Sequence, residues 1–253
     1  ISHLHADHHL GLVRLLNHFE GKNPVLVIGP AALQNWLDVV AQVHPEIKER
    51  YVFVDAVSMR AKNFKRTNCK HLEYAKSRLR DVRGVGVLEC WTIISLPTTH
   101  TSLSELLEQP TRTPIQVLRL SIETVPVFHP SSSSGLVMKR MDSTLKYVYS
   151  GDTKPCEHLI KAGKDATVLI HEATFEDGME KEAKKKRHST VSQALEVGRK
   201  MNAHRVILTH FSARYSKSSP CSDNTERIYC KASDFFSIRS DQFSRMSEYH
   251  KAI

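Results

Sequence analysis

The sequence predicts an α/β (α+β) fold in which β-sheets are flanked by helices. Strands and helices are expected to interleave without a strict βαβ repeat, and no internal repeat is visible. The chain has 253 residues, of which 40% are hydrophobic, which suffices for one sizeable domain and is marginal for two. No apolar run approaches the length of a membrane span and no signal peptide is visible, so no membrane association is expected.

The first half of the chain is expected to alternate between short strands and helices. An extended start gives way to a helix from Leu10, because the next apolar residues fall at helical spacing. Gly21-Lys22-Asn23-Pro24 forms a turn, and Pro45 stops the second helix. The expected elements are strands at 25–28, 51–54 and 86–95, a helix at 31–43, a helix or mobile insertion at 56–83, and a loop at 97–114 with a short helix near 103–107.

The second half is more regular and contains more β-type segments. Beyond residue 216 the chain is polar, and residues 233–253 are expected to form a C-terminal helix or to be partly disordered. The expected elements are strands at 115–128, 135–139, 145–149, 166–170 and 205–209, a flexible loop at 131–134, and helices at 179–187 and 191–201. The strands at 135–139 and 145–149 are expected to form a hairpin.

The charged groups in His3-Leu-His-Ala-Asp-His-His9 point to a metal site at the start of the chain. In an extended segment His3, His5 and Asp7 project to the same side, and His8 is expected to begin a turn into the helix. Imidazole and carboxylate are both good zinc ligands. A surface histidine tract is the alternative. The metal interpretation is favoured provided that further ligands follow downstream.

Charge and cysteine content restrict the function classes. The formal net charge is +9, which suits a polyanionic partner such as nucleic acid, although many basic proteins bind none. The five cysteines are scattered and form no Cys-x-x-Cys pair; they are Cys69, Cys90, Cys156, Cys221 and Cys230. This pattern favours reduced thiols in an intracellular compartment over a disulfide framework.

Four further places carry a ligand-type side chain directly after a β-like run. They are His129, Asp152, the pair His171-Glu172, and His210. Each has an ordinary alternative: a histidine after a strand is more often structural, and Asp152 after Gly151 can be a turn or N-cap residue. Four places of the same design, together with the opening cluster, supply the nitrogen and oxygen ligands and the bridging carboxylate that a dinuclear site requires.

His188 stands apart from these places. It follows a run of lysines and an arginine and precedes a helix, for which Ser189 or Thr190 is a plausible N-cap. An exposed histidine beside solvated lysines and a proton donor in a positive environment are both consistent with this spacing.

Taken together, these motifs resemble a known family. His3-Leu-His-Ala-Asp-His8 resembles the signature of the metallo-β-lactamase superfamily. Four further motifs, in this order, resemble the tRNase Z family of endonucleases, which remove the 3′ trailer from precursor tRNA: Ser150-Gly-Asp-Thr-Lys-Pro155, His171-Glu-Ala-Thr174, His188-Ser-Thr190 and Leu208-Thr-His-Phe-Ser-Ala-Arg-Tyr215. The resemblance implies a metallo-β-lactamase αββα sandwich over residues 1–215, followed by a polar tail at 216–253. Within this family, the sequence most resembles the C-terminal half of the long eukaryotic form.

The resemblance also implies roles for individual residues. His3, His5 and His129 would hold one zinc ion, Asp7, His8 and His210 would hold the other, and Asp152 would bridge them. Asp7 would also orient or deprotonate the attacking water, and His188, polarised by Glu172, would donate a proton to the leaving oxygen. The substrate-binding candidates are Thr153, Ser212, Arg214 and the run 184–187.

The family further implies precursor tRNA as partner, a monomer, and a location in the nucleus or mitochondrion. Its members carry additional N-terminal parts, including the arm that grips the tRNA, so residues 1–253 alone are expected to fold poorly and to cleave little. The alternatives are a glyoxalase II-like thioesterase with the same metals, a non-catalytic RNA-binding fragment, and a structural zinc domain. The last usually prefers cysteine ligands, and none of the five cysteines has suitable spacing.

Overall fold

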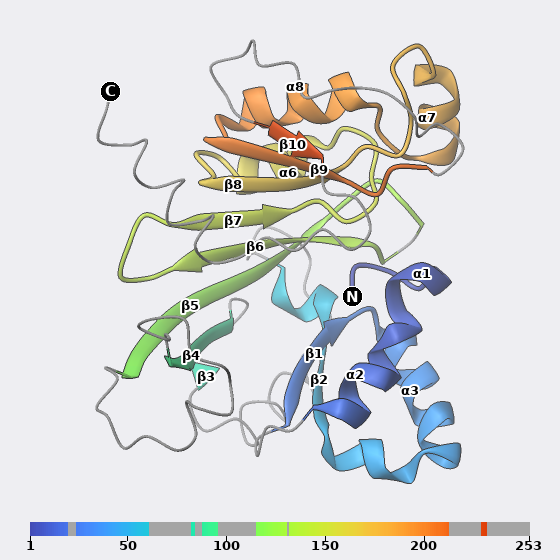
Figure 1. Cartoon of the computed structure of the whole chain (residues 1–253), viewed down its shortest axis with the longest axis vertical. Helices are drawn as coiled ribbons and strands as arrows, with labels where there is room; N and C mark the ends of the chain where they lie inside the picture. Colours follow the sequence, from blue (N-terminus) through green and yellow to red (C-terminus); the bar gives the residue numbers. More distant parts are fainter. Residues whose placement is uncertain are drawn as a thin grey trace.

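The strands form two sheets of unequal size (Figure 1). The computed structural model describes residues 1–19, 24–60, 82–83, 88–95, 115–130, 132–212 and 229–231. The small sheet pairs β1 (Val25–Gly29) with β2 (Tyr51–Asp55) in parallel. The large sheet has the order β10-β9-β8-β7-β6-β5-β4-β3. It comprises β3 (Val82–Arg83), β4 (Leu88–Ser95), β5 (Ile115–Pro126), β6 (Ser134–Arg140), β7 (Lys146–Tyr149), β8 (Val168–Glu172), β9 (Arg205–Thr209) and β10 (Tyr229–Lys231).

In the large sheet the strand pairing changes from antiparallel to parallel at β7. The strands from β3 to β7 pair antiparallel, whereas β7, β8, β9 and β10 run parallel to one another. The carboxyl ends of β7, β8 and β9 therefore lie at one edge of the sheet, where side chains following each strand can meet.

Helices cover the outer face of the small sheet. These are α1 (Ala6–His9), α2 (Gly11–His18) and α3 (Ala31–Val43), followed by the 3₁₀ turns η1 (Pro45–Glu49) and η2 (Ala56–Met59). Val27 and Phe53 point to this helical side and pack with Leu33 and Leu37 of α3. Burial of this apolar surface holds the helices on the sheet.

The opposite face of the small sheet packs on the large one. Val52 and Val54 alternate with Phe53, as the period of a strand requires, and are fully buried with Met59 against Ile28 and Ile122. Ile122 belongs to β5, so this cluster joins the two sheets.

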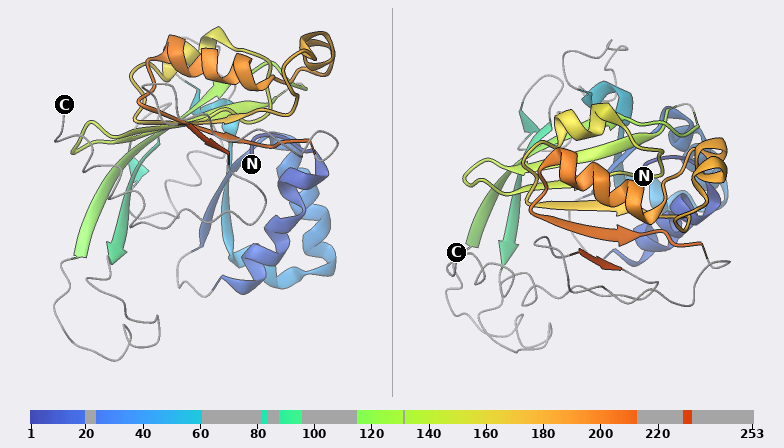
Figure 2. Two further views of the ribbon diagram at one scale, coloured as in Figure 1. Left: turned by 45° about the horizontal axis from the view of Figure 1, so that its top comes forward. Right: turned by 90° about the horizontal axis from the view of Figure 1, so that it is seen from above.

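A second group of helices covers the outer face of the large sheet (Figure 2). It comprises α6 (Glu157–Ala162) and α8 (Val191–Met201), while α7 (Glu180–Lys186) lies beyond the ends of the strands. A Cβ on Gly198 of α8 would lie 2.5 Å from Val206 Cγ2, so glycine permits the close approach of α8 to β9. The order of layers is helices, small sheet, large sheet, helices, which confirms the expected αββα sandwich.

Most predicted elements are observed, one local prediction is wrong, and one short helix was missed. The helices at 31–43 and 191–201 and the strand at 205–209 have the predicted bounds. The start of the chain is irregular, and α1 begins at Ala6, so Asp7 is helical and not part of an extended run. The short helix α6 was not expected.

Several expectations lie outside the described residues. These are the loop at 97–114, most of the segment 56–83, and most of the region beyond 216. Within that last region Tyr229–Lys231 forms β10, which pairs with β9.

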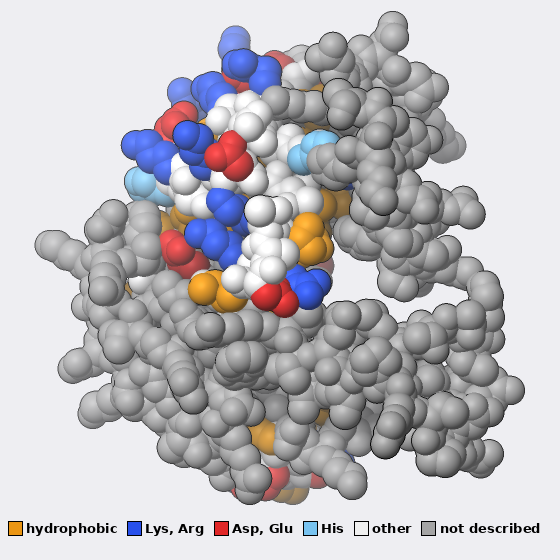
Figure 3. All heavy atoms as spheres, turned by 90° about the vertical axis from the view of Figure 1, so that its left-hand side faces the viewer, with side chains coloured by type: hydrophobic (Ala, Val, Ile, Leu, Met, Phe, Trp, Pro, Cys, Tyr) orange, Lys and Arg blue, Asp and Glu red, His pale blue; other side chains and the backbone are white. Residues whose placement is uncertain are grey.

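The face seen in Figure 3 carries charges of both signs, with lysine and arginine side chains next to acidic ones. Arg140 Nε lies 2.6 Å from Asp142 Oδ1, and Arg199 Nε lies 2.6 Å from Glu196 Oε2. Part of the basic excess is therefore neutralised locally. Among the described residues no helix is both long enough and apolar enough to span a bilayer.

Candidate metal centre

Seven ligand-type side chains converge where the parallel strands end. Asp152 follows β7 and His210 follows β9, while the opening segment brings His3, His5 and His8 to the same edge. Three groups have all their ligand atoms within 4.8 Å of one another: His3, His5, His129 and Asp152 form the first, Asp7, His8 and His210 form the second, and Asp152, His188 and His210 form the third. The first two groups contain the seven residues that the sequence singled out as metal ligands.

Asp152 lies at the centre of both groups. Its Oδ2 lies 3.6 Å from His3 Nε2 and 3.8 Å from His129 Nε2 in the first group. The same oxygen lies 3.3 Å from His8 Nε2 and 3.5 Å from His210 Nε2 in the second. One carboxylate therefore faces both groups, as a bridging ligand must.

The spacing of the ligand atoms suits tetrahedral coordination. Bonds of about 2.1 Å to a tetrahedral zinc place neighbouring ligand atoms about 3.4 Å apart. Asp7 Oδ2 lies 3.4 Å from both His8 Nε2 and His210 Nε2, which matches this edge. His5 Nδ1 lies 3.5 Å from His129 Nε2 and 2.9 Å from His3 Nε2, the second distance being shorter than the ideal edge.

Two buried atoms at the centre lack a partner. Within the described part of the chain, neither His8 Nε2 nor Asp152 Oδ1 has a hydrogen-bond partner. Asp152 is 2% exposed, so its carboxylate is shielded from bulk water. Because an unpaired buried polar atom is costly, this pair of orphaned atoms fits residues that bind cations.

In three histidines the ring nitrogen Nδ1, which faces away from the cluster, contacts a protein oxygen. His129 Nδ1 lies 3.1 Å from the carbonyl of Arg187, and His210 Nδ1 lies 2.8 Å from Thr174 Oγ1. His3 Nδ1 lies 3.0 Å from Ser2 Oγ. A proton donated from Nδ1 leaves the lone pair on Nε2 directed at the cluster, which is the tautomer that a ligand needs.

The environment sets the charge of the ligands. Burial lowers the pKa of His3 to about 3, and burial also lowers the pKa of His129. Burial alone would raise the pKa of Asp152, but the close contact with the His8 ring and the charges of His210, His8 and His3 lower it to about 2. At neutral pH the cluster therefore holds neutral His3 and His129 around an ionised carboxylate, which is the protonation state that binds metal.

Two backbone conformations at the centre are unusual. His210 has φ of 60°, which is rare for a residue with a side chain and turns the imidazole away from the line of β9. Gly151 has φ of 58°, and a Cβ there would lie 2.9 Å from Ser2 Cβ. Glycine at this position lets the chain turn after β7 and place Asp152 at the cluster.

Glu172 and His188 form a second, connected unit. His188 Nδ1 lies 2.8 Å from Glu172 Oε1, and Glu172 is 1% exposed. The same carboxylate accepts hydrogen bonds from the backbone N–H groups of Thr153, Thr174 and Ser189 and from the Thr174 hydroxyl. Burial would lower the pKa of His188, but the hydrogen bond and charge of Glu172 raise it.

Thr174 was missed as a positioning residue. Its hydroxyl lies 2.8 Å from Glu172 Oε2 and 2.8 Å from His210 Nδ1, so it connects the His188 unit with the cluster of candidate ligands. A threonine two residues after the acid in the His171-Glu-Ala-Thr174 motif was the available signal.

The predicted substrate contact of Thr153 is wrong. Thr153 is 0% exposed, its Oγ1 donates to the Lys154 carbonyl, and its carbonyl accepts from Ser189 Oγ. It supports the site from within and does not face solvent. Ser212 lies just after β9, where its N–H donates to the Thr174 carbonyl, and Arg214 lies outside the described residues.

Two histidines of the sequence motifs, His171 and His9, lie outside the cluster. His171 is fully buried, and its Nδ1 lies 2.7 Å from the Glu172 carbonyl. His9 packs edge-on against Trp36, with ring centroids 4.7 Å apart, and its Nδ1 lies 2.9 Å from the His5 carbonyl. The seventh residue of the opening motif therefore attaches α1 to α3.

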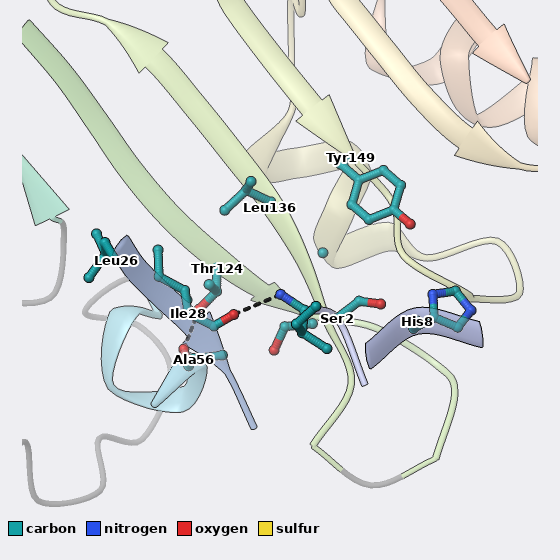
Figure 4. A pocket seen from close by; sticks show the side chains of 11 residues that line it. Ser2, His8, Leu26, Ile28, Ala56, Thr124, Leu136 and Tyr149 are labelled. Atoms are coloured by element: carbon teal, nitrogen blue, oxygen red, sulfur yellow. Dashed lines mark hydrogen bonds between the residues drawn. The ribbon is translucent and has the colours of Figure 1, made fainter. Parts of the chain in front are cut away.

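A cavity of about 410 Å³ lies between the sheets beside the cluster (Figure 4). Leu26, Ile28, Leu136 and Tyr149 give it largely apolar walls, and His8 lies at its margin. Burial raises the pKa of Tyr149 to about 12, so this phenol stays neutral beside the acidic residues.

Residues 83–211 match the family model described as beta-lactamase superfamily domain, and this is about half of the chain. The chain belongs to this superfamily. Within it, the chain is 35% identical to zinc phosphodiesterase ELAC protein 2 of Gorilla gorilla gorilla over 97% of its own length and 26% of the relative's. It is 36% identical to the mitochondrial ribonuclease Z of Drosophila melanogaster over 90% of its own length and 25% of the relative's.

A solved structure shares the fold. The long form RNase Z from yeast aligns with 98% of this chain and 33% of its own, with a TM-score of 0.67 and 23% sequence identity. The chain spans about a quarter of the length of the curated relatives reported above. The predicted resemblance to the tRNase Z family is confirmed by these relatives.

Proposed function

We propose that this chain carries the catalytic centre of a zinc-dependent endoribonuclease that removes the 3′ trailer from precursor tRNA. The observation that supports the proposal most strongly is the central position of Asp152, whose Oδ2 lies within 3.8 Å of ligand nitrogens from both groups. The names of the relatives, zinc phosphodiesterase and ribonuclease Z, support the reaction class and the metal.

The donor set suits two zinc ions. His3, His5 and His129 would hold one ion and Asp7, His8 and His210 the other, with Asp152 shared between them. When bound, a pair of zinc ions lowers the pKa of water and neutralises charge on the phosphoryl oxygens. Each ligand atom is nitrogen or carboxylate oxygen, and the set has no cysteine, which fits an open catalytic site better than a closed structural one.

His188 and Glu172 would supply the proton for the leaving group. The leaving 3′ oxygen of the tRNA needs a proton as the P–O bond breaks, and imidazole titrates near neutral pH. Glu172 holds His188 Nδ1 at 2.8 Å, which leaves Nε2 as the nitrogen that can face substrate. Glu172 therefore acts as a positioning residue, and the higher pKa of His188 keeps more of it protonated.

Asp7 would act on the attacking water. Its side chain is 67% exposed, unlike that of Asp152, and its Oδ2 lies 3.4 Å from His210 Nε2. An exposed carboxylate at the margin of the cluster is placed to orient water and to accept its proton. The products would be a tRNA with a 3′-hydroxyl and a trailer with a 5′-phosphate.

The remaining parts of the proposal follow from the relatives and the sequence. We propose precursor tRNA as the substrate and a monomer as the working form. The mitochondrial name of the Drosophila relative supports a mitochondrial location, and the family resemblance adds the nucleus. A fluorescent fusion of the full-length protein would test the location.

The first test is metal content together with cleavage on the full-length protein. The wild type is expected to hold near two zinc ions per chain and to cleave precursor tRNA. Asp152→Ala should lose metal and cleavage together, because it removes the only carboxylate that faces both groups among the described residues. Asp142→Ala, in an exposed turn and paired with Arg140, is the matched control and should retain both.

Two results would contradict the proposal. Cleavage unaffected by Asp152→Ala would show that the cluster is not the catalytic centre. Hydrolysis of a glutathione thioester without cleavage of precursor tRNA would instead identify a thioesterase of the same superfamily.

A further inference from the structure

A second cavity lies beside His188, outside the ligand cluster. Its volume is about 430 Å³, within the roughly 300–1,000 Å³ of pockets that take small ligands. The loop after β5, the loop after Asp152, and α7 form its walls. The residues that matter for its chemistry are Phe128, Lys154, Glu180, Lys181, Lys184 and His188.

Phe128 gives this pocket an exposed aromatic ring on a fixed backbone. The residue is 43% exposed although it lies beside buried ligands, so its ring does not serve the core. Its N–H donates to Thr153 Oγ1 at 3.0 Å, and its carbonyl accepts from the Lys154 N–H at 3.4 Å. A ring held in this way offers a stacking surface for a nucleobase at little entropic cost.

The rim of the pocket is positively charged. Lys154 Nζ lies 4.9 Å from the centre of the Phe128 ring, and Lys181 and Lys184 lie on the facing helix. Glu180 is the one acidic side chain that lines the pocket among the described residues. Cations interleaved with an aromatic ring are typical of proteins that bind single-stranded nucleic acid.

The pocket is fixed relative to the metal ligands. Arg187 Nη1 donates to the His129 carbonyl at 3.2 Å, and His129 Nδ1 lies 3.1 Å from the Arg187 carbonyl. These two contacts join the end of α7 to the loop that carries Phe128. A ligand in the pocket would therefore keep one position with respect to His188 and the cluster.

We propose that this pocket binds the nucleotide whose 3′ oxygen leaves, which is the last nucleotide of the tRNA portion. The base stacks on Phe128, and Lys154 and Lys184 contact its 5′-phosphate. His188 lines the same pocket, and the proton donor must lie beside the nucleotide that carries the leaving oxygen. This inference rests on the proposed function and adds the subsite that positions the scissile bond.

The test pairs a protein variant with a changed substrate. Full-length, zinc-loaded wild type and Phe128→Leu are compared on precursor tRNA and on the same RNA with an abasic residue at the last tRNA position. Loss of one stacked base costs about 1–3 kcal/mol, or roughly fivefold to 150-fold. Each change alone should lower kcat/KM by that factor. The two changes combined should lower kcat/KM only slightly more than either change alone, because they remove the same contact.

Two matched controls keep the test specific. Phe19 is 39% exposed and lies far from the pocket at the end of α2, so Phe19→Leu should leave kcat/KM unchanged. Lys184→Gln should weaken cleavage of both RNAs, whereas Lys161→Gln on α6 should not.

The outcomes separate this inference from the proposed function. Wild type that cleaves precursor tRNA, with Phe128→Leu equal to it or with additive losses, overturns the subsite and leaves the function intact. Coupling of Phe128→Leu to an abasic residue on the trailer side also overturns it. Absence of cleavage by the zinc-loaded wild type overturns the function itself.

Discussion

Glu172 shows how much of the site depends on one buried side chain. Its two oxygens accept from three backbone N–H groups, one hydroxyl and the His188 ring. Charge-assisted hydrogen bonds of this kind are about twice as strong as neutral ones, so the carboxylate holds the loops after β7 and β8 and the start of α8 together. The geometry of His188 is a consequence of this network.

His188→Ala should lower cleavage by about 10²–10⁴-fold without loss of metal, because it removes the proton donor and no proposed ligand. Glu172→Gln should cause a loss of similar size, since an amide cannot accept from all of these donors. The double variant should be about as active as His188→Ala alone, because Glu172 acts through His188. Single-turnover cleavage and metal analysis measure both effects, and additive losses would contradict this coupling.

Gly151→Ala should destabilise the fold by about 1–3 kcal/mol. The added methyl group meets Ser2 Cβ at 2.9 Å and the Ser134 carbonyl at 3.1 Å in a conformation that already disfavours side chains. Gly178→Ala is the control, because Gly178 also has positive φ but nothing lies within 4 Å of its Cβ position. Thermal denaturation of both variants separates the effect of the close contacts from that of backbone strain. An equal loss of stability in the two variants would mean that the contacts at Gly151 contribute nothing.

At the residue level the sequence predicted which side chains converge better than what surrounds them. His129, Asp152 and His210 each follow an apolar run, and a strand that ends at a site leaves such a pattern. Thr153 was assigned wrongly, because sequence cannot show whether a hydroxyl beside a ligand faces solvent or the protein. Phe128 was missed as a pocket residue, since exposure of an aromatic side chain depends on tertiary packing.

Among the elements, α8 has the best-defined start. Thr190 and Gln193 form a capping box, with each side chain bonded to the backbone of the other residue. The Asp177 carboxylate accepts from the Ser192 N–H at 2.8 Å and from its hydroxyl at 2.6 Å. Burial would raise the pKa of Asp177, but these hydrogen bonds and one from Thr190 lower it.

Asp177→Asn should cost about 1 kcal/mol of unfolding free energy at pH 7, as is typical for loss of a helix cap. A carboxyl group with a lower pKa in the folded state stabilises the protein above its unfolded pKa, near 3.9. The difference between wild type and variant should therefore persist from pH 7 to about 5 and shrink below about 4. Urea denaturation across this range measures it, and a difference that grows on acidification would contradict the assignment.

Element boundaries were predictable where local chemistry marks them. Pro30 and Pro45 flank the helix at 31–43, and Thr190 caps the helix at 191–201, so both were placed correctly. By contrast, α1 has only four residues, and the alternation of histidines suggested an extended chain. Its helical turn brings Asp7 and His8 to the cluster, and contacts with distant residues such as His210 override the local pattern.

For the whole molecule, the net charge of +9 predicts a strong salt dependence of RNA binding. If about six phosphates are contacted, affinity for precursor tRNA should fall roughly a thousandfold between 50 and 200 mM salt. Arg199→Gln is the control, because Arg199 pairs with Glu196 on the far end of α8 and should not change the slope. Filter binding over a salt series measures this, and a flat dependence would contradict an electrostatic RNA interface.

Removal of metal should lower the stability of the whole chain. The proposed ligands come from loops at one edge of the large sheet and from the opening segment, so metal binding would favour the folded state alone. Free zinc at about a hundredfold above its Kd should add about 3 kcal/mol, which a chelator removes. Asp152→Ala should show a smaller change on chelation than wild type, and equal changes would mean that the ions bind elsewhere.

The contact between Asp7 and His210 joins positions 203 residues apart in the chain. Closing a loop of that length costs entropy, which the contacts between the two segments must offset. During synthesis the first residues leave the ribosome long before β9 does. The second group would then be incomplete until residue 210 has emerged, so under the proposed function a partly made chain would not yet hydrolyse the RNA that surrounds the translation machinery.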